Sequence, residues 1–205
     1  MSPTPGGPAP TLVLASGSPR RRELLATLGL RFEVRPPDVD ESARPAEAGP
    51  AYVERLARAK ATALVRPGEL VLAADTTVDL DGALLGKPAD PAEARGLLRS
   101  LSGRSHCVHT GVAVSWFAGE GPCARVVSEV STTVVTFGEV PPRWVEWYVG
   151  TDEPYDKAGG YGVQGAAGVF VTRVDGSPSN VVGLPLDVVA RLVDESGHDL
   201  LSFAG

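Results

Sequence analysis

The sequence of 205 residues contains no isoleucine, one asparagine, one glutamine and only two cysteines. Two cysteines, Cys107 and Cys123, are too few for a secreted scaffold held together by disulfides. No apolar run approaches the roughly 20 residues that a membrane-spanning helix needs, and residues 1–10 have neither the basic nor the apolar region of a signal peptide. We therefore expect a soluble cytoplasmic protein, outside any membrane, with a flexible tail at residues 1–10.

Lysine is also scarce, with three residues, Lys60, Lys87 and Lys157, against sixteen arginines. Where arginine has so largely replaced lysine, the remaining lysines can mark positions that need a compact ammonium group; chance survival is the alternative. The net charge is −6, and an acidic protein repels nucleic acids and anionic lipids. Any phosphate must then be bound by a few cations placed inside a local pocket.

Apolar patterning predicts an α/β fold with a mixed sheet and two lobes around a central cleft, because neighbouring and distant strands both occur. Residues 105–117 and 124–137 form a long hairpin, which disfavours a purely parallel sheet, and no flexible linker divides the segment 11–205. We expect one domain there. The other predicted strands cover 11–15, 32–35, 70–78 and 169–174; the predicted helices cover 19–28, 51–65, 91–100, 142–148 and 185–196.

A strand-to-helix turn, SGSPRRR at residues 16–22, is the first candidate binding segment. Its small residues let the backbone approach a ligand, and a helix N-terminus with its free N–H groups attracts anions. Three arginines in the first turn oppose the helix dipole, which favours a bound triphosphate or pyrophosphate as their partner. The alternative is an ordinary capped helix with a solvated basic turn.

Acidic residues that follow an apolar strand are the second candidate. Asp75 and Asp79 share one face of that strand with Thr77, and paired carboxylates can hold Mg²⁺ or activate water. For Asp79 and Asp81 we favour a solubilising role at the tip of a hairpin. Asp75 has apolar flanks, which favour a functional role.

Two loop segments carry further polar candidates. Lys87 follows a strand end, and the glycine-rich segment 156–165 holds Gln164, whose amide could recognise the edge of a nucleobase. A lone glutamine is otherwise usually a surface residue. His106 and His109 lie on opposite faces of a strand without a second pair of ligands, so we interpret them as structural, and a nucleophilic Cys107 is disfavoured for want of partners.

Six motifs in order together resemble the Maf family, the septum-formation-inhibitor-like nucleoside triphosphate pyrophosphatases. They run from Leu12 to Leu186 and so cover nearly the whole chain. Each motif alone is weak, but six in order are specific. The motifs are LVLASGSPRRRELL, AADTTV, LLGKPAD, LSGRSHCVHTGVAV, DEPYDKAGGYGVQG and VVGLPL.

The resemblance implies an elongated fold similar to inosine triphosphate pyrophosphatases, a homodimer, and hydrolysis of a nucleoside triphosphate to the monophosphate and pyrophosphate with Mg²⁺ or Mn²⁺. Asp75 matches the general base and, with Glu41, a metal ligand; Glu41 lies in a loop that the pattern constrains poorly. Further positions match the polar lining of the phosphate region: Ser16, Ser18, Arg20, Lys60 and Lys87.

Substrate preference divides the family, and Arg21, Thr76 and Gln164 resemble the trio of the dTTP- and UTP-hydrolysing branch. A guanidinium and an amide can satisfy the O4 and N3–H edge of thymine or uracil, and modified pyrimidine nucleotides present a similar edge. The cationic base of 7-methyl-GTP would favour an acid and an aromatic side chain. Two alternatives stay open: the 7-methyl-GTP branch, and a nucleotide-binding regulator of division arrest with little turnover.

Overall fold

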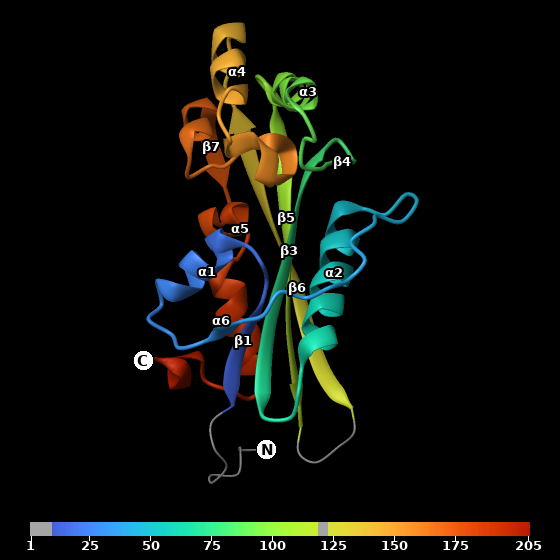
Figure 1. The fold of residues 1–205 in the computed structure, drawn as a ribbon, viewed down its shortest axis with the longest axis vertical. Helices are drawn as coiled ribbons and strands as arrows, with labels where there is room; N and C mark the ends of the chain where they lie inside the picture. The colour runs from blue at the N-terminus through green and yellow to red at the C-terminus, as the bar shows by residue number, and fades with distance from the viewer. Residues whose placement is uncertain (1–9, 119–122) are drawn as a thin grey trace.

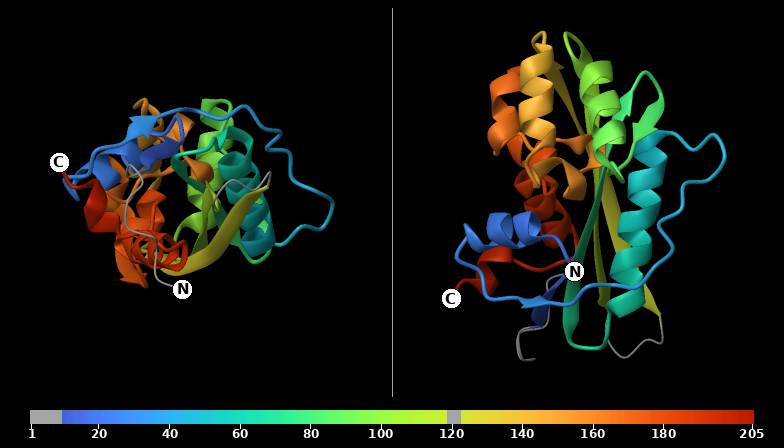
Figure 2. Two further views of the ribbon diagram at one scale, coloured as in Figure 1. Left: turned by 90° about the horizontal axis from the view of Figure 1, so that it is seen from below. Right: turned by 45° about the horizontal axis from the view of Figure 1, so that its top comes forward.

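The fold is described from a computed structural model, which covers residues 10–118 and 123–205. Most of the predicted tail at residues 1–10 and the predicted hairpin turn at 119–122 lie outside the described residues. The molecule is elongated, with one twisted sheet along its length and helices on both faces (Figures 1 and 2). This is the α/β class with a mixed sheet that the sequence predicts.

Three long strands form the middle of the sheet. β3, β5 and β6 have 12, 13 and 14 residues and pair antiparallel through β5. β1 runs parallel to both β2 and β3. Within the described residues the sheet has seven strands in the order β2-β1-β3-β5-β6-β7, with β4 paired to β3. Their bounds are Thr11–Ala15, Glu33–Val34, Glu69–Leu80, Ala83–Leu85, Ser105–Phe117, Ala124–Phe137 and Val171–Asp175, from β1 to β7.

Capping residues set the starts of several helices. Ser18 caps α1 and Asp90 caps α3, each followed by a proline at the first helical position. No helix in the described part of the chain is long and apolar enough to cross a membrane. The helices α1 to α6 cover Pro19–Ala26, Gly49–Leu64, Pro91–Leu101, Pro142–Val149, Pro178–Val182 and Leu186–Glu195, and the 3₁₀ turns η1 to η4 cover Glu153–Asp156, Ala158–Gly160, Ala166–Phe170 and Leu200–Phe203.

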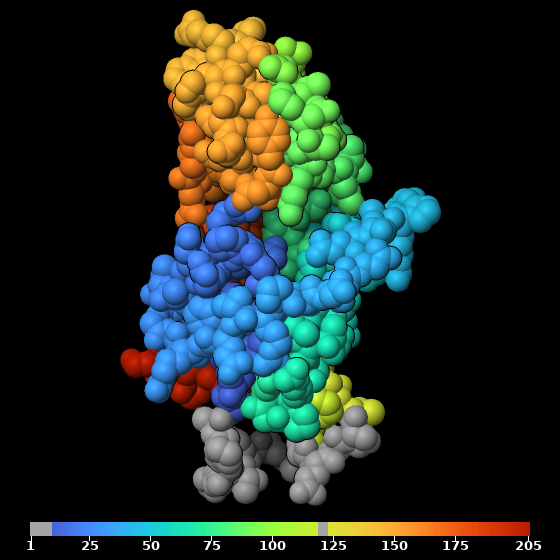
Figure 3. All heavy atoms as spheres, in the orientation of Figure 1, coloured from blue at the N-terminus to red at the C-terminus, as the bar shows by residue number. Residues whose placement is uncertain are grey.

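Within the described residues three hydrophobic clusters pack on the sheet. One lies between α2 and the strands β1, β3 and β5. The other two lie one above the other along the same strands. The lower core packs α1 and α6 against β1 and the adjoining halves of β3 and β5. The upper core packs α3 and α4 against the other halves of β3 and β5. Figure 1 shows these two lobes, with α2 along one side of the sheet. In Figure 3 the chain between β2 and α2 protrudes from the surface beside that helix.

Helix α2 packs very closely on the sheet. Gly111 of β5 lies opposite Asp75 in the β3–β5 register. A Cβ atom at Gly111 would lie 2.5 Å from the carbonyl carbon of Val53 and 2.7 Å from the nitrogen of Glu54. Only glycine therefore lets the backbone of α2 approach the strand here, next to Asp75.

The sequence-based prediction misses some short elements. The strand predicted at 32–35 is reduced to Glu33–Val34. Residues 176–183, between the predicted strand 169–174 and the predicted helix 185–196, contain α5. Ser177 caps that short helix and Gly183 ends it with φ +117°. Five residues are too few to show a helical hydrophobic period, so only the cap and the closing glycine signal this element.

Candidate active site

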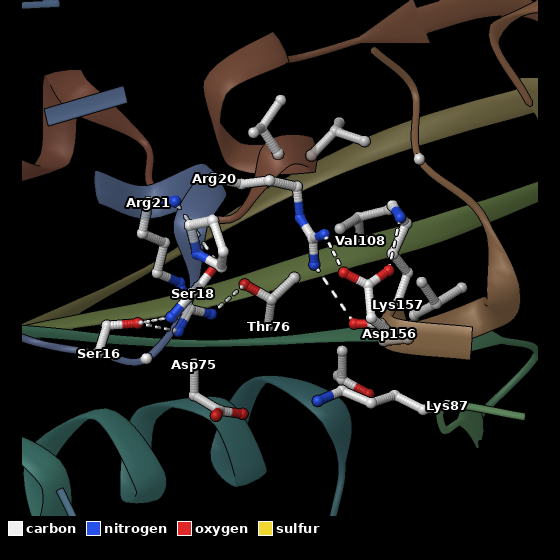
Figure 4. A pocket seen from close by; sticks show the side chains of 18 of the residues that line it. Ser16, Ser18, Arg20, Arg21, Asp75, Thr76, Lys87, Val108, Asp156 and Lys157 are labelled. Atoms are coloured by element: carbon white, nitrogen blue, oxygen red, sulfur yellow. Dashed lines mark hydrogen bonds and ion pairs between the residues drawn. The ribbon is translucent and has the colours of Figure 1, made fainter. Parts of the chain in front are cut away.

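A pocket of about 840 Å³ lies between the two lobes. Its walls come from the turn before α1, the middle of β3, the end of β4, the η1–η2 segment and α5. The close-up in Figure 4 shows side chains from these separate segments pointing toward one another. All ten residues that the sequence suggests for a site line it: Ser16, Ser18, Arg20, Arg21, Glu41, Lys60, Asp75, Thr76, Lys87 and Gln164.

Asp75 is the buried acid of the pocket. Its exposed fraction is 7%, and its Oδ1 accepts a hydrogen bond of 2.6 Å from Lys60 Nζ on α2. Burial raises the pKa of the Asp75 carboxyl, while the neighbouring cations Lys60 and Arg21 work against that rise. A carboxylate that is buried but paired can stay ionised and still have an elevated proton affinity, which suits a general base.

Lys60 bridges two carboxylates. Its Nζ also lies 2.7 Å from Oε1 of Glu41, which belongs to the exposed loop before α2. An ammonium group thus lies between the two predicted metal ligands, and both oxygens already point at one cation. Mg²⁺ typically takes one or two carboxylates and completes its shell with phosphate oxygens and water. Asp75 and Glu41 fit that donor set. Among the described residues no group of three or more histidine, cysteine or acidic side chains is placed to hold a metal.

The turn before α1 brings its serines and two of its arginines to the pocket. Ser18 Oγ accepts from the backbone N–H of Arg21, and Ser16 Oγ accepts from that of Ser18. Arg20 and Arg21 line the pocket, while Arg22 does not. The turn therefore supplies hydroxyl groups and two guanidinium groups where the helix dipole is positive.

All three lysines of the protein line this one pocket. Lys60 is buried, Lys157 is partly buried and Lys87 is exposed. The sequence interpretation is that lysines kept in an arginine-rich protein mark positions that need a compact ammonium group, and the structure brings these three positions together. Lys157 is a pocket residue that sequence reasoning singled out by its rarity but did not assign to the site.

Arg21 is held mainly by protein groups. Its Nε donates to the carbonyl of Gly183 at 2.7 Å, and its Nη1 donates to the carbonyl of Ala74 at 2.8 Å and to Ser16 Oγ at 3.4 Å. Its Nη2 donates to Thr76 Oγ1 at 3.0 Å. Burial lowers the pKa of this guanidinium. Because four of its five N–H groups are used, Arg21 has one left for a ligand.

A chain of hydroxyl groups continues from Thr76 into the protein. Thr76 Oγ1 lies 2.9 Å from Oγ1 of the buried Thr110, which donates to the carbonyl of Asn180 at 3.0 Å. The carbonyl of Asn180 cannot donate, so Thr110 uses its one hydroxyl proton on that carbonyl. Thr110 can then only accept from Thr76, which makes Thr76 the donor in the contact between the two hydroxyl groups. The hydroxyl proton of Thr76 is then committed, and Thr76 can only accept from a ligand. Thr110 supports Thr76 from inside the protein and does not line the pocket. The sequence gives no local signal of this contact, because Thr110 lies inside a strand.

An ion-pair cluster lies in the η1 part of the pocket. Asp156 accepts from Arg20 Nη1 at 2.6 Å and from Lys157 Nζ at 2.5 Å. Burial works to raise the pKa of the Asp156 carboxyl, but the hydrogen bonds from Lys157 and Arg20 outweigh it, so that the pKa lies below its ordinary value. Gln164 is exposed in the loop that follows, at the rim of the same pocket.

Several polar residues lie elsewhere, as expected. Asp79 Oδ1 accepts from the Gly82 N–H in the turn between β3 and β4, and Asp81 pairs with Arg104. His106 is buried against Tyr161, and burial lowers the pKa of its imidazole to about 4. His109 Nδ1 bonds to Thr132 on the other face of the strand. Both histidines are structural, and neither they nor Asp79 line the pocket.

Comparison with known proteins agrees with this arrangement. The family model described as Maf-like protein matches residues 11–196. A dTTP/UTP pyrophosphatase of Anaeromyxobacter sp. (strain Fw109-5) is 54% identical over 92% of this chain and 91% of its own. Proteins of the same name are 51% identical in Myxococcus xanthus, over 92% and 94%, and 45% identical in Syntrophus aciditrophicus, over 95% and 93%. With its pocket residues in place and a family match over nearly its whole length, the chain belongs to the Maf family.

Proposed function

We propose that this protein is a nucleoside triphosphate pyrophosphatase that hydrolyses dTTP and UTP to the monophosphate and pyrophosphate. The observation that carries the proposal is a buried carboxylate, Asp75, in a pocket that also gathers every lysine of the chain. Relatives with about half of their residues identical bear the name dTTP/UTP pyrophosphatase, which supports the same substrates here.

In the proposed reaction Asp75 accepts a proton from a water molecule that attacks the α-phosphorus. The bond between that phosphorus and the oxygen bridging to the β-phosphate breaks, and the bridging oxygen leaves with pyrophosphate. Lys60 keeps the buried Asp75 ionised before the attack. Arg20, Lys87 and the N–H groups of the turn before α1 bind the phosphates and stabilise the charge that develops on them.

We propose Asp75 and Glu41 as the residues that hold a divalent cation. When bound, Mg²⁺ or Mn²⁺ supplies positive charge to the phosphate oxygens in the transition state. The two carboxylates that now share Lys60 are the groups available for it. Their shared ammonium contact supports this assignment, because it places both oxygens around a single positive charge.

For the base we propose recognition through Thr76, Arg21 and Gln164. Thr76 Oγ1 has an acceptor position left and no free proton, so it suits the N3–H of uracil or thymine. The N3 of cytosine is an acceptor and would face an oxygen that cannot donate. The amide of Gln164 and the remaining N–H of Arg21 can serve the two carbonyl groups of the base. The apolar residues Val78 and Val108 in the same pocket suit its ring faces.

We further propose a homodimer in the cytoplasm, built from one domain that covers residues 11–205, with no role for nucleic acid or a membrane. A size measurement in solution tests the dimer. A regulator that binds nucleotide with little turnover is the remaining candidate from another class. The presence of a buried acid, the lysines and an anion-binding turn in one pocket favours catalysis over binding alone.

The experiment that tests the function is a nucleotide panel with Mg²⁺ or Mn²⁺. dTTP, UTP, CTP, GTP, ITP and 7-methyl-GTP are supplied, and pyrophosphate and phosphate are assayed separately. We expect pyrophosphate from dTTP and UTP above all others. Release of phosphate instead would contradict cleavage between the α- and β-phosphates, a preference for 7-methyl-GTP would favour the other branch, and bound nucleotide without turnover would favour the regulator.

A further inference from the structure

Two pocket cations converge on one carboxylate. Arg20 at the start of α1 and Lys157 after η1 both donate to Asp156, one to each carboxylate oxygen, at 2.6 and 2.5 Å. Arg20 Nη2 also donates to the backbone carbonyl of Asp156 at 3.3 Å. Figure 4 shows the three side chains together, with both cations pointing at the carboxylate. The contact joins residues 136 positions apart, from the two sides of the pocket.

Folding does not explain this carboxylate. The Asp156 side chain is 58% exposed, that of Arg20 is 31% exposed and that of Lys157 is 15% exposed. Ion pairs with so exposed a carboxylate contribute little to stability. An acid in this place also opposes the binding of any polyphosphate, because it neutralises cations that a phosphate needs. Asp156 therefore weakens the same pocket that Arg20, Lys87 and Lys157 make positive.

The geometry suits the replacement of one anion by another. A carboxylate and a phosphate both present paired oxygens to a guanidinium, and both accept short hydrogen bonds from an ammonium. Lys157 Nζ has a second acceptor, the carbonyl of Glu153 at 2.8 Å, which keeps the lysine in place when the carboxylate moves away. The site for an anion is thus already formed, and an anion of the protein occupies it.

We propose that Asp156 is an internal competitor of the substrate, which holds Arg20 and Lys157 in the empty pocket and yields both cations to phosphate oxygens of the nucleotide. The proposal rests on the proposed function for the identity of the substrate. After the reaction the carboxylate returns to the two cations and so helps pyrophosphate to leave. Asp156 is a positioning residue and takes no part in the bond-breaking step.

The first experiment measures binding of inorganic pyrophosphate to Asp156→Asn by calorimetry, in EDTA and at low salt. The amide keeps the size of the side chain and removes its charge. Because an exposed ion pair is worth up to about 1 kcal/mol, we expect the Kd for pyrophosphate to fall about two- to fivefold. The matched control is Asp152→Asn, which removes the same charge from an exposed residue of the same segment that does not line the pocket.

A second pair of variants separates competition from simple orientation of the cations. Arg20→Gln should weaken pyrophosphate binding more in the Asp156→Asn background than in the native protein, because Asp156 no longer offsets the arginine there. The KM for dTTP should fall with Asp156→Asn and stay unchanged with Asp152→Asn. If pyrophosphate binds more weakly to Asp156→Asn than to Asp152→Asn, the carboxylate only orients the cations and the proposal is wrong.

Failure of this proposal and failure of the proposed function can be told apart, since binding of pyrophosphate needs no turnover. Tighter binding by Asp156→Asn supports the internal competitor even if dTTP and UTP are not cleaved. Equal or weaker binding overturns it even if both nucleotides are cleaved well.

Discussion

Replacing Gly111 with alanine tests the packing that holds Lys60 against Asp75. The added Cβ would lie 2.5 Å from the Val53 carbonyl carbon and 2.7 Å from the Glu54 nitrogen, whereas two carbon atoms in contact normally lie about 3.5–4.0 Å apart. These atoms belong to the backbone of α2, so no side-chain rotation can make room. The helix must move away from the sheet by about 1 Å.

That displacement acts on the site directly. Gly111 lies opposite Asp75 on the neighbouring strand, and α2 carries Lys60, which lies 2.6 Å from Asp75. A shift of about 1 Å in a catalytic arrangement can cost about 100-fold in rate, and overpacking costs about 1–3 kcal/mol of stability. We expect kcat/KM for dTTP to fall about 100-fold in Gly111→Ala, and we expect this variant to unfold at a lower urea concentration than the native protein.

The measurement compares pyrophosphate release and urea unfolding in Gly111→Ala and in Gly96→Ala. Gly96 lies exposed in α3, and beyond its chain neighbours and the backbone of its own helix a Cβ there would have no atom within 4 Å. Alanine in that helix should stabilise the protein by about 0.5–1 kcal/mol without changing activity. Native activity together with native stability in Gly111→Ala would refute the close packing of α2 on β5 as the cause.

Three further predictions concern the pocket. Thr110→Val removes the acceptor of the Thr76 hydroxyl proton, so the preference for UTP over CTP in kcat/KM should fall on the order of tenfold. The control Thr110→Ser keeps the chain of hydroxyl groups and should keep the preference. An unchanged preference in Thr110→Val would refute the direction assigned to the Thr76 proton. Because the pKa of Asp75 is raised in the folded state, its contribution to stability is greatest at low pH and is lost as pH rises through the folded value. In EDTA, the unfolding free energy of Asp75→Asn minus that of the native protein should therefore increase from pH 4 to pH 7. A difference that stays constant over this range would contradict the raised pKa of Asp75. Removal of divalent cations with EDTA should stop pyrophosphate release, and added Mg²⁺ should restore it. The circular dichroism spectrum should stay unchanged in EDTA, because Lys60 already joins Asp75 and Glu41 without a metal. Turnover that persists in EDTA would count against a metal at these carboxylates.

Much of the fold could be predicted because its strands are long and its helices are capped. The hairpin of β5 and β6 was predicted with the bounds that the structure has, from its valine- and threonine-rich runs. Asp90 and Pro91 likewise marked the start of α3. Short elements such as α5 were missed, because five residues are fewer than the hydrophobic period needs.

Some residues of the candidate site could be predicted from the sequence, whereas the contacts between them could not. Asp75 could be singled out from its apolar flanks, and the lysines from their rarity. The contact of Arg20 with Asp156 could not be predicted, since it joins residues 136 positions apart and depends on how two lobes meet. The donor direction from Thr76 to Thr110 depends on two oxygen–oxygen distances, which only a three-dimensional structure contains.

The strands β3 and β5 pass through both lobes without interruption, and the hydrophobic clusters of the two lobes both include residues of these strands. Two bodies joined by a flexible linker can swing apart, but two bodies that share hydrogen-bonded strands can only rotate slightly as the sheet twists. Bending the molecule at the pocket would break the ladder between these strands beside Asp75. The pocket walls that do not belong to the sheet include the chain between β2 and α2 and the segment from η1 to Gly165. The strand that carries Asp75 is thus held in place by both lobes at once.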